Sequence, residues 1–191
     1  MAELKKFLKG VSPDIRMAPA VVMENAVLSA AIEFCSRAPV WLVENTQIYI
    51  PAGFQTGRAP RVAAQSVIDH YIEIRRDGGV LRPGVSYDVL PDRNIKLTSE
   101  LEEDVILTAI VALKPTRDAT QLPDILFNQY YEAITHGARA RLLAQTNQEW
   151  GDPQASDYHR RIFEGEVGQF RVDQTAKGGS GGLFVRPRRV F

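Results

Sequence analysis

The spacing of hydrophobic residues divides the chain into a helical segment, a β-rich segment, a second helical segment and a C-terminal tail. Hydrophobic residues recur every three or four positions over residues 19–38, which predicts a helix with Met23, Val27 and Phe34 on one stripe. A second stripe, which contains Cys35, widens the predicted buried face. Pro39 is expected to end the helix, because a residue that precedes proline disfavours the helical conformation.

The middle of the chain, residues 41–114, is rich in the β-branched and aromatic residues that favour strands. Its strand-like segments, separated by glycine and proline, are WLVENTQIYI, VIDHYIEIRR, VSYDVL and VILTAIVAL. Asp77, Gly78 and Gly79 predict a tight hairpin turn after IEIRR. Both alternating faces of VILTAIVAL are apolar, which predicts a strand that is central in a sheet or covered on both faces.

Helical spacing returns over residues 123–145 and again over residues 153–168, where Asp152 and Pro153 form a helix start. Gly137 lies within the first of these helices, where glycine lowers helix stability, and it therefore predicts a close contact with another helix. Trp150 is predicted to pack at the junction of the two helices. Residues 173–191 have no periodic pattern and are predicted to form an extended arm.

Together these elements predict an α+β fold, in which the N- and C-terminal helices form a small bundle beside the β-rich middle region. Residues 1–172 are expected to form one domain, and residues 173–191 an extended C-terminal docking arm. A chain of 191 residues that is 45% hydrophobic can bury a core of this size.

Composition and charge narrow the functional classes. Lys plus Arg equals Asp plus Glu at 23 each, so no overall charge attracts nucleic acid. A single cysteine excludes an internal disulfide framework and a cysteine-based zinc site. No hydrophobic run approaches the roughly 20 residues of a membrane span, and the first residues lack the pattern of a secretory signal. The chain is therefore expected to be soluble and to be made in the cytoplasm.

No catalytic, cofactor-binding or metal-binding residue is predicted, and the chain is expected not to be an enzyme. Its histidines, His70, His136 and His159, lack the spacing of a metal site. Asp69 and His70 are neighbours on a predicted strand, so their side chains are expected to face opposite sides. His136 and His159 are predicted to be surface or packing residues, and Cys35 a core residue.

Two clusters of charge leave alternatives open. The acidic residues at positions 100, 102, 103 and 104 fit a solvated loop, a negative ring if copies assemble symmetrically, or a metal site. The C-terminal segment is both basic and apolar, and follows the flexible run GGSGG. It fits a nucleic-acid arm, a solvated tail without a role, or a docking arm. The expected docking residues are Leu183, Phe184, Val185, Arg186, Arg188, Arg189 and Phe191.

Two segments carry distinctive packing patterns. The first is AVLSAAIEFCSRAPVW, residues 26–41, an alanine-rich helix that ends in EFC and is followed by a tryptophan. The second spans residues 130–167 and reads Y-x-x-A-I-x-x-G-A, then R-L-L, then W-x-D-P, then an aromatic helix. Together they resemble the head–tail adaptor (connector) proteins of tailed bacteriophages, and the likeness covers most of residues 19–167.

The resemblance implies a structural protein without cofactors, which forms a ring of roughly twelve copies beneath the portal protein. Such a ring joins the portal to a tail or nozzle protein and leaves a channel, through which DNA passes without sequence-specific binding. The implied location is the neck of the virion, between capsid and tail. The alternative is a nucleic-acid-binding module that uses the basic C-terminal tail.

Overall fold

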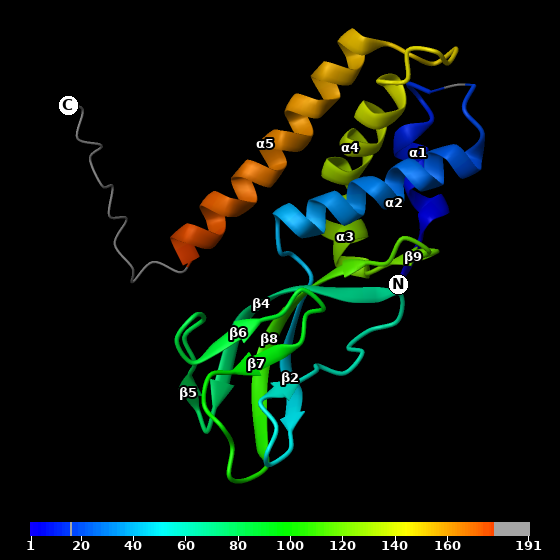
Figure 1. Ribbon diagram of the computed structural model, residues 1–191. Coiled ribbons are helices and arrows are strands. Elements are labelled where there is room, and N and C mark those ends of the chain that lie inside the picture. Colours follow the sequence, from blue (N-terminus) through cyan, green and yellow to red (C-terminus); the bar gives the residue numbers. More distant parts are fainter. Residues whose placement is uncertain (16, 178–191) are drawn as a thin grey trace, which may run out of the picture.

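The computed structural model describes residues 1–15 and 17–177, which form a helical bundle joined to a β unit (Figure 1). The bundle contains the long helices α2 (Ala20–Arg37), α4 (Tyr131–Leu143) and α5 (Pro153–Lys177). Shorter elements lie beside them: β1 (Ala2–Glu3), η1 (Leu4–Phe7), α1 (Leu8–Val11), β9 (Gln121–Leu122) and α3 (Asp124–Gln129). The β unit contains β2 (Leu42–Ile50), β3 (Thr56–Gly57), β4 (Ser66–Arg76), β5 (Gly79–Val80), β6 (Tyr87–Val89), β7 (Ile95–Leu97) and β8 (Val105–Pro115). The predicted α+β fold is confirmed.

The bundle core forms where the hydrophobic stripes of α2, α4 and α5 meet. Phe34 of α2 is fully buried, and its ring centre lies 6.0 Å from that of Phe163 on α5. A Cβ atom at Gly137 of α4 would lie 2.7 Å from the Phe163 ring, so glycine allows this approach and the predicted close contact is confirmed. Trp150, between α4 and α5, packs against the same core, as predicted.

The predicted helix over residues 123–145 is two helices, because the chain leaves the helical conformation at Tyr130 (φ −121°, ψ 21°). The break allows aromatic side chains on both sides of it to contact the N-terminal segment. Phe127 of α3 and Tyr131 of α4 both pack on Phe7, with ring centres 5.3 and 5.4 Å away. Tyr130 itself packs on Phe34 at 5.1 Å. These contacts compensate for the lost helical hydrogen bonds.

Helix α5 is longer than predicted. It continues to Lys177 rather than ending near residue 168, so residues 173–177 of the expected arm are helical. Gly165 and Gly168 weaken the helix locally. Val167 is nonetheless buried in the bundle core and Phe170 packs against it, which explains why the helix continues past both glycines.

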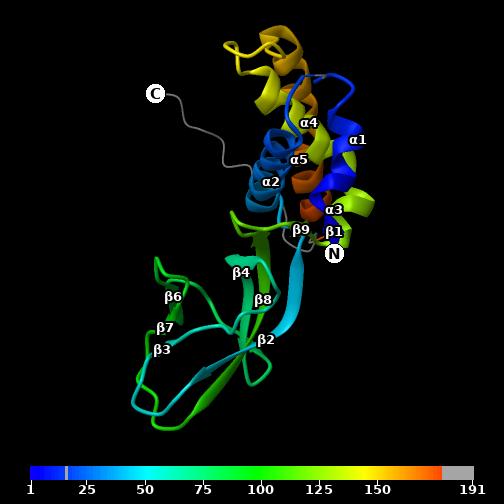
Figure 2. The same ribbon diagram turned by 90° about the vertical axis from the view of Figure 1, so that its right-hand side faces the viewer.

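The β unit consists of two antiparallel sheets. The larger sheet has the order β2-β8-β4-β5 and the smaller has the order β3-β7-β6. Figure 2 shows the smaller sheet on one side of the larger, with the bundle at one end of the strands. Asp77 and Gly78 have positive φ angles (50° and 81°) and join the paired residues Arg76 and Gly79, as the predicted hairpin requires.

Strand β8 is central, as predicted, but it is covered on one face more fully than on the other. The face that carries Leu107 and Val111 is buried in a second hydrophobic core, separate from that of the bundle. On the opposite face, Ala112 is buried near the bundle, whereas Ile106 at the far end is 56% exposed. The prediction of a strand covered on both faces therefore holds only near the bundle.

Candidate partner-binding surfaces

Asp69 and His70 contact each other, contrary to the sequence-based expectation. His70 Nδ1 lies 3.1 Å from Asp69 Oδ2. The reason is a β-bulge in β4: Ile68 pairs with Leu113 and His70 pairs with Ala112, so Asp69 has no partner of its own. The bulge breaks the simple alternation of side chains that the prediction assumed.

Asp69 belongs to a polar cluster at the junction of the β unit and the bundle. Lys114 Nζ lies 2.6 Å from its carboxylate and also donates a hydrogen bond of 3.3 Å to Ser36 of α2. Burial alone would raise the pKa of Asp69, but the hydrogen bonds from Lys114 and His70 outweigh it and lower the pKa below its ordinary value. The charged carboxylate therefore pairs with Lys114, and the hydrogen bond from Lys114 to Ser36 ties the sheet to α2.

His136 of α4 and His159 of α5 also meet, although they are far apart in sequence. Their Nδ1 atoms are 2.7 Å apart, so one ring donates a hydrogen bond to the other. Asp14 lies 3.6 Å from the Nε2 atom of His159 and 3.0 Å from Arg139. Burial lowers the pKa of both histidines, and Arg139 lowers it further. The pair holds two helices together while at least one ring is neutral.

Cys35 is a core residue, as predicted. It is fully buried, and burial raises the pKa of its thiol to about 12, so it is not a nucleophile at neutral pH. Among residues 1–15 and 17–177, no group of three or more His, Cys, Asp or Glu side chains is placed to hold a metal ion.

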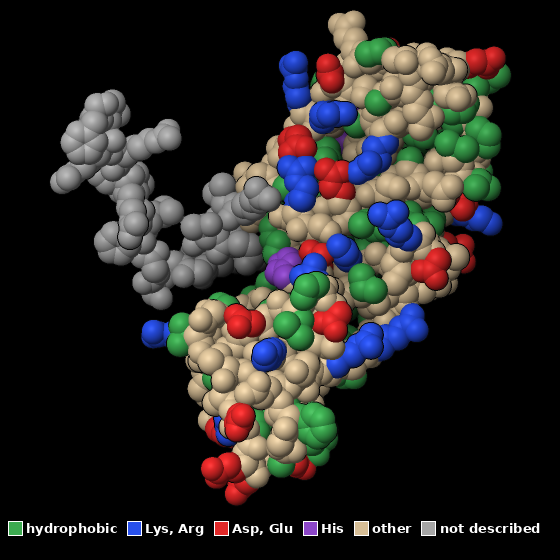
Figure 3. Space-filling view, in the orientation of Figure 1, with side chains coloured by type: hydrophobic (Ala, Val, Ile, Leu, Met, Phe, Trp, Pro, Cys, Tyr) green, Lys and Arg blue, Asp and Glu red, His purple; other side chains and the backbone are tan. Residues whose placement is uncertain are grey.

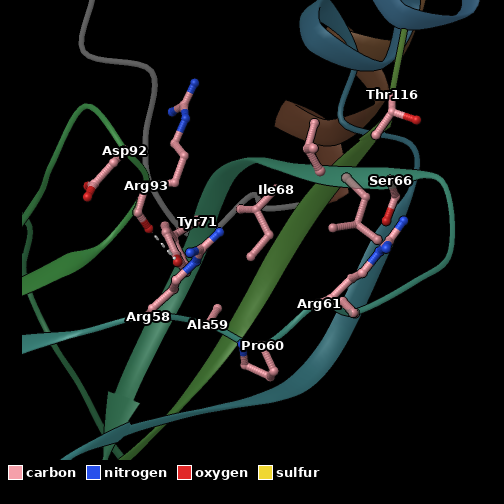
Figure 4. Close-up of a pocket in the computed structure, with 13 residues that line it drawn as sticks. Arg58, Ala59, Pro60, Arg61, Ser66, Ile68, Tyr71, Asp92, Arg93 and Thr116 are labelled. Atoms are coloured by element: carbon pink, nitrogen blue, oxygen red, sulfur yellow. Dashed lines mark hydrogen bonds between the residues drawn. The ribbon is translucent and has the colours of Figure 1, made fainter. Parts of the chain in front are cut away.

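A groove of about 670 Å³ lies on the β unit, and three arginines line it (Figure 4). Arg58 and Arg61 come from the segment between β3 and β4, and Arg93 from the turn between β6 and β7. Arg93 lies 4.0 Å from Asp69, whereas Arg58 and Arg61 make no ion pair with the residues that the structure describes. We call this surface the arginine groove. Its remaining wall is largely apolar and includes Pro60, Val62, Ile68 and Leu113.

The backbone around the arginine groove is held in place by hydrogen bonds. The hydroxyl of Tyr71 on β4 donates to the carbonyl of Arg93 at 2.9 Å, which ties the β6–β7 turn to the larger sheet. Asp92, the one carboxylate among the lining residues, accepts hydrogen bonds from Asn94 at 3.1 Å (backbone) and 2.7 Å (side chain). The groove therefore has an excess of positive charge at fixed backbone positions.

The acidic cluster lies at the end of the β unit farthest from the bundle, where Figure 3 shows acidic side chains. Asp104 accepts hydrogen bonds from the Tyr49 hydroxyl at 2.6 Å and from the Ala52 N–H at 2.9 Å, and these lower its pKa. Glu100, Glu102 and Glu103 are exposed, and the described part of the chain offers them no ion pair.

Exposed hydrophobic residues lie beside these carboxylates. The N–H of Gly53 donates to the carbonyl of Leu101 at 3.0 Å, which brings the loop that carries Phe54 against the acidic loop. Phe54 is 62% exposed, and Ile106, the second residue after the acidic loop, is 56% exposed. We call residues 100–104, together with Phe54 and Ile106, the acidic tip.

The sequence revealed the acidic cluster but neither the exposed hydrophobic residues beside it nor the arginine groove. The four acidic residues are contiguous or nearly so, whereas Arg58 and Arg61 are distant in sequence from Arg93, and the pairing of β3 with β7 in the smaller sheet brings Arg58 near Arg93. The predicted docking residues of the C-terminal arm, positions 183–191, lie outside the residues that the structure describes.

Within the described residues, no helix is both long enough and apolar enough to cross a membrane. Comparison of the sequence with models of protein families and with curated proteins found no match.

Proposed function

We propose that this chain is a structural head–tail adaptor of a tailed bacteriophage, and that its copies form a ring between the portal and the tail. In this role it is not an enzyme and needs no cofactor. DNA passes through the channel of the ring without sequence-specific binding, and the ring is located in the neck of the virion.

One observation carries the proposal: the two segments that resemble adaptor proteins pack against each other in one core. Phe34, from the first segment, contacts Tyr130 and Phe163, from the second, at ring distances of 5.1 and 6.0 Å. Gly137, a position of the second pattern, lies against the Phe163 ring, and its Cβ would lie 3.1 Å from Ala30 of the first. The residues that carry the resemblance are therefore parts of one packing unit, as expected if they reflect a shared fold.

The surface of the β unit supports assembly with other chains. Most of the large hydrophobic side chains that are exposed within the described residues belong to this unit, including Tyr49, Phe54 and Ile106. These exposed side chains give the β unit apolar surface that another chain can cover.

The proposal is tested by measuring the mass of the purified full chain over a range of concentrations, alone and with the portal protein of the same virion. Sedimentation velocity and negative-stain imaging should show a closed ring with a central channel, alone or on the portal. A chain that stays monomeric in both conditions refutes the proposal. Salt-sensitive binding of duplex DNA by that monomer would favour the nucleic-acid-binding alternative instead.

The predicted docking arm is tested separately with a chain that ends at Lys177. We expect this chain to keep its thermal stability, because the bundle core lies within the residues that remain. We also expect it to lose its place on portal-containing particles. Normal incorporation of the shortened chain would show that residues 178–191 are not a docking element.

A further inference from the structure

We infer that the arginine groove of one copy binds the acidic tip of the next copy. The inference rests on the proposed function, because it names the contact through which copies of the chain would form a ring. It goes further by assigning the contact to two surfaces of the β unit.

Within the described residues, the carboxylates of the acidic tip make no ion pair with the arginines of the groove of the same chain. Val105 directly follows the acidic loop, and Leu113 lines the arginine groove. Both belong to the central strand β8, and at most about 26 Å separates their backbones at the rise of an extended chain. In a single copy the exposed carboxylates and arginines are solvated, so they can pair with opposite charges of another copy.

The charges of the two surfaces match. Glu100, Glu102 and Glu103 are exposed without an ion pair in the described part of the chain, and the same holds for Arg58 and Arg61. A guanidinium group binds a carboxylate through two parallel hydrogen bonds, so arginine suits this contact better than lysine would. Burying such pairs between copies would satisfy both sets of charges.

The apolar parts of the two surfaces favour a protein partner over nucleic acid. The floor and wall of the groove carry Pro60, Val62 and Ile68 between the arginines. The acidic tip supplies both carboxylates and an exposed aromatic side chain, Phe54, which can cover this wall. A phosphate backbone would use the arginines and leave the apolar wall in water.

The contact joins two different surfaces of the same chain, so each copy has one groove and one tip to offer. Such a head-to-tail contact repeats from copy to copy, and it gives a closed ring when the rotation between neighbours closes. The pattern fits the ring that the proposed function requires.

The contact is tested by exchanging its charges in the full chain. One variant carries Arg58→Glu and Arg61→Glu, and a second carries Glu102→Lys and Glu103→Lys. Each variant alone presents like charges across the contact, so its half-assembly concentration should rise more than about tenfold over wild type in sedimentation velocity. An equal mixture of the two should assemble again, because each surface then meets its opposite. A chain with all four substitutions should also assemble.

The control is Arg160→Glu with Arg161→Glu, two exposed arginines on α5 of the bundle, which should assemble as wild type does. All the substituted side chains are exposed, so thermal denaturation should show unchanged folding. If wild type assembles and both charge variants do so equally well, the contact is refuted while the ring remains supported. If wild type never assembles, both proposals fail. Loss of duplex-DNA binding in the groove variant, with assembly unchanged, would identify the groove as a nucleic-acid surface and refute the contact.

Discussion

Replacing Gly137 with alanine provides a sharp test of the bundle packing, because two opposing effects can be estimated from the structure. Alanine favours a helix over glycine by about 1 kcal/mol. The added Cβ would, however, lie 2.7 and 2.9 Å from two atoms of the Phe163 ring and 3.1 Å from the Cβ of Ala30. Carbon atoms in good contact are about 3.5–4.0 Å apart, so the ring must move by most of an ångström.

The Phe163 ring has little room to move, because it is 4% exposed and packs against Phe34. Overpacking of a core costs about 1–3 kcal/mol, and the upper part of this range applies to a confined ring. After the gain in helix propensity, we expect Gly137→Ala to destabilise the chain by about 1–2 kcal/mol. At about 2–4 °C per kcal/mol for a chain of this size, Tm should fall by roughly 2–8 °C.

Gly165→Ala is the matched control, because Gly165 is also helical but has no atom within 4 Å of its would-be Cβ. It should therefore stabilise the chain by about 1 kcal/mol, which raises Tm. The double variant Gly137→Ala, Phe163→Leu should show a favourable coupling of about 1 kcal/mol in urea denaturation, since the smaller side chain relieves the overlap. A Gly137→Ala chain as stable as Gly165→Ala would refute the close packing of α4 on α5.

Three further predictions concern polar contacts. Burial lowers the pKa of His136 and His159, so the unfolded chain binds more protons, and stability should fall as the pH drops through and below their ordinary value of 6.5. His159→Gln should reduce this dependence in thermal denaturation; an unchanged pH slope would contradict it. Lys114→Met leaves the buried Asp69 carboxylate without its closest partner, so it should lower the free energy of unfolding by about 2–3 kcal/mol in urea denaturation. The same substitution should lower it by less in a chain that already carries Asp69→Asn. Equal costs in the two backgrounds would show that the pair is not coupled. Asp152 caps the start of α5, because it accepts hydrogen bonds of 3.0 Å from the N–H groups of Gln154 and Ala155. Asp152→Ala should therefore lower the free energy of unfolding by about 1 kcal/mol in the same assay. The control Asp157→Ala, on the exposed face of α5, should lower it little. A similar loss of stability in both variants would argue against helix capping by Asp152.

Features that depend on neighbouring residues were predictable from the sequence. The stripes of α2 follow from spacing alone, and Asp77 with Gly78 is a turn signal because both residues tolerate a positive φ. Asp152 with Pro153 marked the start of α5 in the same way. Gly137 was informative because glycine within a helix lowers stability, so a packing reason was expected and the structure supplies one.

The arginine groove could not be predicted, because no local pattern connects its residues. Arg58 and Arg61 lie in one connection and Arg93 in another, and the two connections adjoin the paired strands β3 and β7 of the smaller sheet. The larger sheet supplies other walls of the groove, such as Ile68 and Leu113. The four acidic residues of the tip were visible as a cluster, but the groove that we propose as their partner was not, because complementarity between separate surfaces produces no spacing pattern in the sequence.

The sequence by itself determined the approximate positions of the long helices and strands, because the hydrophobic period, proline and glycine act over a few residues. The tertiary structure alone decided the break at Tyr130, the bulge at Asp69 and the contact between His136 and His159. The break and the bulge each depart from a regular local pattern, and each gains contacts with distant residues: aromatic packing on Phe7 and Phe34 for the break, and the ion pair with Lys114 for the bulge. These contacts depend on which distant segments pack together, and the local pattern of residues does not specify that packing.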